Sequence, residues 1–309
     1  MWTKLGLVFD ASKFTNQTWF YSSGLTPQPY RLNEAVIRVF AGFRDAEGVS
    51  RVGYVDLNSD DPSQILSVSE KPVLDIGHDG CFDDNGIILG DVVEGPQGLY
   101  LFYVGFQLVK KAKFLAFSGV ALSEDGGESF QRMSESPILG RERLQSTIGA
   151  IHTVLFENGI WRIWFARGNS WEVIDGIHYP RYHICYTETT DLFHFPKSSV
   201  MCIEADLPEY RIGRPKVYRL ADKSYVMYAT KGTIYGEYTP SFFRSADGIR
   251  WERDDCSLGI SPSDSGWDSE TLCYPALISQ GNKTLMFYNG NRMGFNGFGA
   301  AVTKDLILH

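Results

Sequence analysis

A short phrase recurs along the chain: a hydroxyl residue, then an Asp, often with an aromatic residue close behind. The two clear copies begin at Ser123 (Ser-Glu-Asp-Gly-Gly-Glu-Ser-Phe) and at Ser245 (Ser-Ala-Asp-Gly-Ile-Arg-Trp). Two weaker copies begin at Thr187 and Thr303, so neighbouring copies lie 58 to 64 residues apart. Repeats of this period, each holding several short strands, are typical of sheets stacked radially around an axis, as in a β-propeller.

A second pattern keeps its register between the repeats. Each unit has a segment in which aromatic residues are followed by small ones, beginning at Val39, Phe102, Trp164, Met227 and Phe287. The position 13 residues before the second residue of each segment is occupied by Pro27, Gly90, His152, Pro215 and Pro275. We call these five positions the register marks, and they indicate that two successive strands keep a constant offset in every unit.

The two patterns together predict five units, over about 20–78, 79–140, 141–204, 205–264 and 265–309. We expect an all-β fold: a five-bladed β-propeller of four-stranded antiparallel blades, formed by residues 1–309 as one domain. The N-terminal stretch through Phe9 is expected to supply the strand that closes the ring. A two-sheet sandwich is the alternative, because sandwiches also show short strands with regular turn signals.

Composition supports strands and limits the partners. The alternation of Leu99 to Tyr103 and of Trp161 to Phe165 has the period of a β-strand. The net charge is −8 and Lys and Arg are not densely clustered, which argues against nucleic acid or an anionic membrane as the main partner. No run of about 18 apolar residues predicts a membrane span. The start lacks the pattern of a signal peptide, so a cytoplasmic location is expected.

No cofactor and no metal site is expected. The five cysteines, which we expect to be buried thiols, form no Cys-x-x-Cys pair; they are Cys81, Cys185, Cys202, Cys256 and Cys273. The acids and histidines show no metal-ligand spacing on a helix, and no glycine-rich loop stands between a strand and a helix.

Three segments add a family likeness to the repeat; they cover 82–86 (Phe-Asp-Asp-Asn-Gly), 209–215 (Glu-Tyr-Arg-Ile-Gly-Arg-Pro) and 266–275 (Gly-Trp-Asp-Ser-Glu-Thr-Leu-Cys-Tyr-Pro). Over nearly its whole length the chain resembles the five-bladed β-propeller glycosidases of the arabinanase, xylosidase and invertase type, and the related mannoside phosphorylases. Through the three segments it is most similar to uncharacterised propeller proteins of bacterial surface-polysaccharide loci. This resemblance implies a carbohydrate context and three carboxylates at the mouth of a central funnel: a base or nucleophile, an orienting Asp and an acid. The phrase at Ser123 also matches the Asp-box of sialidases, which we interpret as a structural hairpin turn.

Register selects the candidate catalytic acids. Asp84 and Glu209 each lie six residues before a register mark, and Glu270 lies five before Pro275, with Asp268 seven before it. Glycoside cleavage needs one protonated carboxyl group and one ionised one. We expect Glu270 to be the acid and Asp84 the base or orienting group, with Glu209 as the other contender and the roles exchangeable. The alternative is that these acids cap turns, and Asp83 competes with Asp84 as the inward member of its pair.

Two arginines suggest a charged ligand. Arg211 and Arg214 flank the same strand as Glu209, and a guanidinium group suits bidentate binding of a carboxylate or phosphate. Either they pair with Glu209, or the ligand is an acidic sugar, a sugar phosphate or a nucleotide sugar. Arg44 and Asp45 are similar to the Arg-Asp pair of the invertase clan, although they also suit a hairpin turn.

The remaining candidates for sugar binding are aromatic, histidine and amide side chains. They lie on the expected inner strands, at the end of the last inner hairpin or, for Trp171 and His178, in a long insertion of the third unit. Aromatic rings stack on pyranose faces, and histidines and amides bind hydroxyl groups, but a lone histidine or asparagine also serves structure. The residues are His152, Trp171, His178, Tyr274, Asn289 and Asn291.

The leading hypothesis is an enzyme of the glycoside hydrolase type that acts on a glycosidic bond of an anionic sugar by carboxylate acid–base catalysis. A phosphorylase or a glycosyltransferase would use the same residues, and a requirement for phosphate would separate the phosphorylase. A non-catalytic carbohydrate-binding propeller is the alternative of another class, because a fold alone does not fix function.

Overall fold

The computed structural model describes the chain except residues 15, 197 and 237. Its described part is built almost entirely of strands, with one helical turn, α1 (Asn291–Gly294), and two short 3₁₀ turns (Ala11–Lys13 and Asp255–Ser257). The expected all-β class is therefore confirmed.

Two of the sheets have four antiparallel strands each. One has the order β2-β3-β4-β5, with bounds Ser22–Arg31, Val36–Arg44, Ser50–Asn58 and Ile65–Val68. The other has the order β1-β20-β19-β18, with bounds Thr3–Asp10, Gly297–Thr303, Lys283–Asn289 and Cys273–Gln280. The first strand of the chain therefore pairs with the last one.

The third sheet consists of three antiparallel groups of four strands. The first is β6 to β9 (Ile87–Gly95, Gly98–Val109, Ala112–Ser123, Gln131–Arg132). The second is β10 to β13 (Ile148–Glu157, Ile160–Ile174, Ile177–Thr189, Val200–Ile203). The third is β14 to β17 (Glu209–Arg219, Tyr225–Thr233, Tyr238–Ser245, Glu252–Arg253). Short parallel contacts between β8 and β10 and between β12 and β14 join them.

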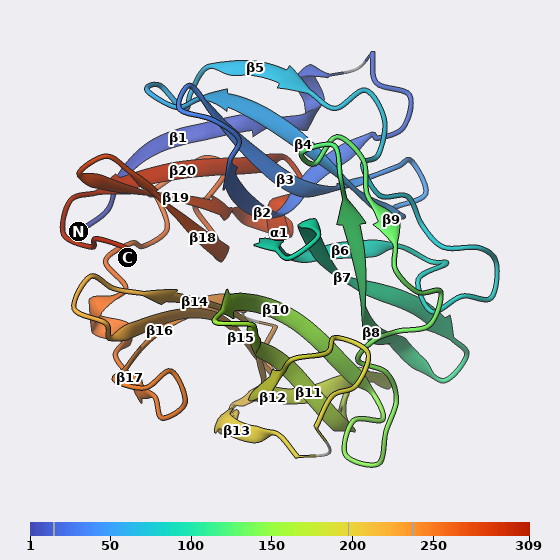
Figure 1. The fold of residues 1–309 in the computed structure, drawn as a ribbon. Helices are drawn as coiled ribbons and strands as arrows, with labels where there is room; N and C mark the ends of the chain where they lie inside the picture. The colour runs from blue at the N-terminus through green and yellow to red at the C-terminus, as the bar shows by residue number, and fades with distance from the viewer. Residues whose placement is uncertain (15, 197, 237) are drawn as a thin grey trace.

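The groups are arranged around a common centre (Figure 1). Their leading strands touch one another in turn: β2 contacts β6, β6 contacts β10, β10 contacts β14, β14 contacts β18, and β18 contacts β2. Because the strands of a group are antiparallel, the starts of the leading strands lie at one end of the fold. The hairpins β3–β4, β7–β8, β11–β12, β15–β16 and β19–β20 lie at the same end. We call this end the mouth.

Every leading strand is irregular at its register mark. The pairing with the second strand shifts around Pro27, Gly90, His152, Pro215 and Pro275. Before each of the three prolines stands a residue with positive φ: 50° at Thr26, 54° at Arg214 and 55° at Tyr274. Bulges of this kind redirect side chains. The repeat in the sequence therefore marks the places where the leading strands turn side chains toward one another.

The Asp-box turn has the structural role expected from its sequence. Asp125 accepts hydrogen bonds from the backbone of Glu128 and Ser129, both at 3.0 Å, and from the Ser129 hydroxyl at 2.6 Å. Although partial burial acts to raise it, hydrogen bonds from Ser123 and Ser129 lower the pKa of Asp125 to about 2. In the second copy, the carbonyl of Gly248 accepts a bond of 2.8 Å from the Trp164 indole of the preceding group. These turns thus attach neighbouring groups to each other.

Aromatic side chains fill the space between groups. Phe40 of β3 packs with Tyr103 of β7 in one buried cluster, and Trp164 of β11 packs with Met227 of β15 in another. Burying side chains of this size contributes roughly 1.5 to 3 kcal/mol each.

All five cysteines are free thiols. Cys185 and Cys273 are buried as expected, whereas Cys81 and Cys202 are partly exposed and Cys256 is exposed, so the expectation of buried thiols is wrong for Cys256. Within the described residues, no helix is long and apolar enough to cross a membrane.

Candidate functional site

A buried ion pair joins three leading strands at the centre. Nζ of Lys216 donates to the Gly90 carbonyl at 2.7 Å and to Asp91 at 3.1 Å. The other oxygen of Asp91 accepts a bond of 2.8 Å from the backbone of Val154. Burial raises the pKa of Asp91 and lowers that of Lys216, since each loses hydration. β6, β10 and β14 are held together here by groups that are costly to bury singly.

Arg214 lies beside this pair. The positive φ of the bulge directs its guanidinium to the Leu89 carbonyl of β6, 2.7 Å away, and over the ring of Tyr274 at 5.3 Å. Arg214 also acts on His152, whose ring is buried. Burial first, then the charges of Arg214 and Lys216, hold the pKa of His152 well below its usual value. His152 is therefore a neutral imidazole at physiological pH, and its Nδ1 has no partner among the described atoms.

Arg211 lies nearer the mouth, enclosed by aromatic rings. The central carbon of its guanidinium is 4.9 Å from the ring centroids of both Tyr210 and Tyr238. Its side chain lies against Gly232 of β15, where a Cβ atom would come within 2.4 Å of Arg211 Nε. This Nε is buried and lacks a hydrogen-bond partner within the described part of the chain.

Tyrosines link the two arginines into one site. The rings of Tyr238 and Tyr274 are 5.6 Å apart, edge to face, with Arg211 over the first and Arg214 over the second. Tyr182 of β12 completes the surroundings of Arg211. Burial raises the pKa of Tyr210 and Tyr274 to about 12 and that of Tyr238 well above its usual value, so their hydroxyl groups stay protonated. We define these two arginines and four tyrosines as the arginine–tyrosine site.

The ion pairs of the described residues include neither Arg211 nor Arg214. Glu209, which the sequence suggested as their partner, binds other cations. Its carboxylate accepts from Arg253 at 2.8 Å and lies 3.2 Å from Lys231. Within the described residues, no carboxylate therefore pairs with either arginine.

Asp83 and Asp84 lie in the turn before β6, not in a strand, so the alternation expected from the sequence does not apply to them. Asp84 is half-buried and accepts from the Gly80 backbone at 2.9 Å and from Asn85 at 3.1 Å, which stabilises the turn before β6. Asp83 is buried and pairs with Arg132 at 2.7 Å.

Glu270 is exposed at the mouth, in the turn before β18. Its backbone and that of Thr271 donate to Asn291 Oδ1 at 2.7 and 3.2 Å. The neighbouring Asp268 is buried and binds Lys4 of β1 at 2.7 Å and the Tyr288 hydroxyl at 3.0 Å. No hydrogen bond or ion pair of the described residues joins any two of Asp84, Glu209 and Glu270.

The other candidates separate into structural and exposed positions. Asp45 forms the β3–β4 turn, accepting from the backbone of Val49 at 2.9 Å and from Arg51 at 2.6 Å, and Arg44 ends β3 next to it. Asn289 is fully buried and bonds Thr26, Gly24 and Gly297 at 2.8 Å each.

The long hairpin of β11 and β12 carries two more candidates. Trp171 is partly buried against the cluster that contains Phe117 of β8, and His178 is exposed near the hairpin tip. Of all the candidates, the structure thus brings together Arg211, Arg214, Tyr274 and His152 at the centre.

Five residues at the centre were not among the candidates selected from the sequence: Tyr182, Tyr210, Tyr238, Asp91 and Lys216. Asp91 and Lys216 directly follow the register marks Gly90 and Pro215, so the repeat contained a signal for them. The tyrosines come from three strands of two groups, and nothing in the spacing connects them.

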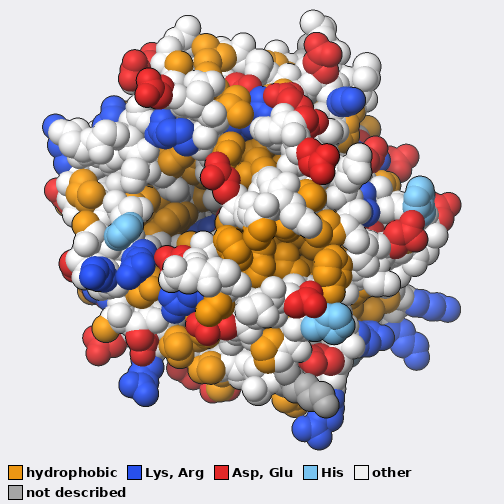
Figure 2. Space-filling view, in the orientation of Figure 1, with side chains coloured by type: hydrophobic (Ala, Val, Ile, Leu, Met, Phe, Trp, Pro, Cys, Tyr) orange, Lys and Arg blue, Asp and Glu red, His pale blue; other side chains and the backbone are white. Residues whose placement is uncertain are grey.

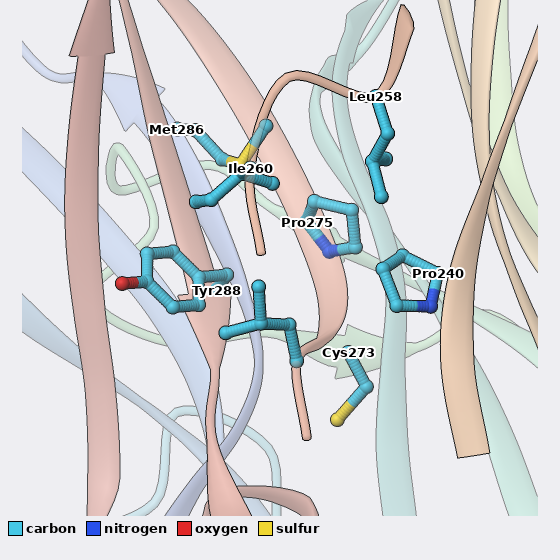
Figure 3. Close-up of a pocket in the computed structure, with 8 residues that line it drawn as sticks. Pro240, Leu258, Ile260, Cys273, Pro275, Met286 and Tyr288 are labelled. Atoms are coloured by element: carbon cyan, nitrogen blue, oxygen red, sulfur yellow. The ribbon is translucent and has the colours of Figure 1, made fainter. Parts of the chain in front are cut away.

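A small apolar pocket lies between the third group and β18 and β19, lined by Pro240, Leu258, Ile260, Leu272, Cys273, Pro275, Met286 and Tyr288 (Figure 3). Its volume of about 10 Å³ and its lack of polar lining suit a packing gap and not a sugar. The space-filling view shows a hollow in the molecular face, with hydrophobic side chains in it and charged ones near its edge (Figure 2). Among the described residues, no group of three or more His, Cys, Asp or Glu could hold a metal ion.

Comparisons with known proteins agree with this architecture. No protein-family model matches the chain. The chain is 27% identical over 305 residues to a Mycobacterium tuberculosis protein described as "Uncharacterized protein Rv1502", covering 98% of this chain and 99% of that one. A solved "Glycoside hydrolase" is similar with a TM-score of 0.74 and 15% identity, over 98% of this chain and 92% of the other.

A further solved structure belongs to work on the GH130 family of mannoside phosphorylases, which contains glycoside hydrolases that target β-1,2 mannosidic linkages in Candida mannan. It matches with a TM-score of 0.70 and 13% identity, over 99% of this chain and 94% of the other. These likenesses show that the chain has the propeller-like fold of glycoside hydrolases.

Proposed function

We propose that the chain is a carbohydrate-active enzyme that acts on a glycosidic bond of an acidic, phosphorylated or nucleotide-linked sugar, in cytoplasmic metabolism of surface polysaccharide. The observation that carries this proposal is the arginine–tyrosine site. At the centre of a glycoside-hydrolase-like fold, Arg211 and Arg214 lie over tyrosine rings. Neither arginine pairs with a carboxylate of the described residues. Rings offer stacking surfaces to a sugar, and the arginines offer charge to an anion.

The proposed architecture is a single domain of five four-stranded blades. Each expected unit, from 20–78 to 265–309, contains one group of strands, and β1 supplies the fourth strand of the last group. The cyclic contacts of the leading strands support a closed ring. Lys4 of β1 strengthens the closure through Asp268 of the loop before β18.

The proposed chemistry uses carboxylates at the mouth. An acid gives its proton to the glycosidic oxygen while a base takes a proton from water, so the C–O bond breaks and the water oxygen bonds to the anomeric carbon. We propose Glu270 as acid and Asp84 as base or orienting group, because both stand at the mouth end of leading strands with exposed or half-buried side chains. Glu209 stays a candidate, although its oxygens are engaged by Arg253 and Lys231.

The sugar would contact the remaining candidates around the ring. Tyr274 and His152 adjoin Arg214 at the centre, while Trp171 and His178 would reach the sugar from the β11–β12 hairpin. Arg44, Asp45, Asn289 and Asn291 lie at the same end. Asp45 and Asn291 support the shape of the mouth through the turns that they stabilise, and Asn289 does so by joining the end of β19 to Gly24 of β2.

A phosphorylase is the second candidate, favoured by the arginines. Phosphate would take the place of water and leave the sugar as its 1-phosphate. A glycosyltransferase, or a protein that binds carbohydrate without turnover, would also use the arginine–tyrosine site.

The experiment is a turnover assay on a panel of oligosaccharides and activated sugars, with and without inorganic phosphate. Glu270→Gln and Asp84→Asn should each lower turnover about 10²- to 10⁴-fold with little change in melting temperature, because they remove positioned proton transfer and keep the shape. Glu252→Gln, on exposed β17, is the matched control. Near-full activity of both variants would exclude this acid–base assignment, and turnover only with phosphate would favour the phosphorylase.

A further inference from the structure

The arginine–tyrosine site contains an excess of hydrogen-bond donors. Arg211 Nε is buried without a partner among the described residues, and the guanidinium of Arg214 donates to the Leu89 carbonyl. A guanidinium has five N–H donors and no acceptor. Burial keeps the hydroxyl groups of Tyr210, Tyr238 and Tyr274 protonated. The hydroxyls of Tyr238 and Tyr274 share one hydrogen bond, and the O–H groups of Tyr210 and Tyr274 remain to donate. The complementary ligand therefore carries several acceptor oxygens.

The charge of the centre points to more than one negative charge on this ligand. The side chains of Arg211, Arg214 and Lys216 are cationic. Among the described residues, Asp91 is the carboxylate that pairs with one of them, Lys216. The excess is thus two positive charges. A carboxylate neutralises one of them, whereas a phosphoryl group carries about −1.5 to −2 with three acceptor oxygens.

We propose that the arginine–tyrosine site binds a phosphoryl group, either as free inorganic phosphate or as the phosphate ester of a sugar. Arg211 and Arg214, which lie over the rings of Tyr210, Tyr238 and Tyr274, donate to its oxygens, and the tyrosine hydroxyls supply further donors. This proposal rests on the proposed function only for the statement that the ligand contains a sugar. It chooses a phosphoryl ligand over an acidic sugar that carries only a carboxylate.

Binding is measured by calorimetry on the full chain at low salt with five probes: inorganic phosphate, sulfate, glucose 1-phosphate, glucuronate and glucose. Inorganic phosphate or glucose 1-phosphate should bind at least about tenfold more tightly than glucuronate, and glucose should bind weakest. Tighter binding of glucose 1-phosphate identifies a phosphate ester as the ligand, and tighter binding of inorganic phosphate identifies the free ion. Equal or tighter binding of glucuronate would overturn the proposal, as would the absence of binding by both phosphates.

The pH dependence gives an independent arm. The second pKa of a phosphate ester is about 6, so its affinity should fall about tenfold between pH 7.5 and pH 5, where the dianion becomes a monoanion. Sulfate is the control because it stays a dianion over this range. Its binding reports any titration of the groups that face the site. These are the four tyrosines of the site, Tyr179, Glu172, His152, Asp91, Lys216 and Cys273. Equal losses for sulfate and glucose 1-phosphate would contradict recognition of the dianion.

Variants connect the binding to the site. Arg211→Gln and Arg214→Gln should each weaken phosphoryl binding at least about tenfold. Arg244→Gln changes an exposed side chain of β16 in the same group and should leave the binding unchanged. Tyr238→Phe retains the ring and removes only the hydroxyl, so it tests the site if an arginine variant fails to fold. Unchanged affinity in Tyr238→Phe and in every folded arginine variant would exclude this site.

The two proposals can fail separately. Because Asp84→Asn and Glu270→Gln remove the proposed acid–base groups without touching the arginines, they should bind phosphoryl ligands as the native protein does. Phosphoryl binding without any turnover would refute the enzyme and keep the site. Turnover of a sugar that carries only a carboxylate, unaffected by Arg211→Gln and Arg214→Gln, would refute the site and keep the enzyme.

Discussion

Gly232 and Arg211 touch so closely that any side chain at residue 232 would displace the guanidinium. A Cβ atom there would lie 2.4 Å from Arg211 Nε and 3.1 Å from its Cγ. We therefore expect Gly232→Ala to move Arg211 away from the rings of Tyr210 and Tyr238 and to weaken anion binding at least about tenfold. Calorimetric titration with the preferred anion checks this expectation.

Gly140→Ala serves as the control for this change. Its Cβ would meet Pro137 at 3.1 Å, far from β14, and should leave the affinity as it is. Equal affinity in Gly232→Ala and the native protein would show that the position of Arg211 does not matter for the ligand.

Lys216 and Asp91 should be worth more to stability than an ion pair at the surface. Lys216→Met leaves the carboxylate of Asp91 buried without its cation, a change that typically costs about 3 to 5 kcal/mol. Denaturant unfolding measures the loss, and the double variant Lys216→Met/Asp91→Asn should recover part of it. Arg244→Met breaks the more exposed pair with Asp254 and should cost below about 1 kcal/mol. Equal losses in the two single variants would mean that the central pair is effectively solvated.

The strand architecture could be predicted from the sequence because the repeat records backbone geometry. Each register mark falls where a leading strand bulges, and the bulge recurs at the same offset from the second strand in every unit. The Asp of the Asp-box is likewise tied to a turn by short-range hydrogen bonds, so its role is visible in a single copy. Sequence signals of this kind arise from local backbone contacts and recur along the chain.

The site could be predicted only in part, because register gives a position along a strand and not a direction. Glu209 and Arg211 are two residues apart in β14, yet the pairing shifts between them. Glu209 consequently pairs with Arg253, while Arg211 lies among tyrosines. The contact of Tyr182 with this site crosses from one group to the next, and such long-range contacts leave no spacing in the sequence.

His152 should make stability depend on pH. Its ring is buried beside Arg214 and Lys216, and its pKa in the folded protein lies well below the ordinary value of about 6.5. As the pH falls through 6.5, the unfolded chain takes up a proton here and the folded protein does not. The free energy of unfolding should therefore fall, by up to about 1.4 kcal/mol per pH unit from this one residue.

The measurement compares the native protein with His152→Gln by denaturant unfolding between pH 7.5 and pH 5. His183 also has a lowered pKa, through burial and the charge of Arg167, but it is present in both proteins and so cancels in the difference. We expect the slope of stability against pH to be smaller in His152→Gln, because glutamine cannot take up a proton in either state. His178→Gln removes an exposed imidazole and should keep the native slope. Equal slopes for the native protein and His152→Gln would mean that the imidazole is protonated to the same extent in the folded and unfolded states. Burial and the charges of Arg214 and Lys216 would then not lower its pKa.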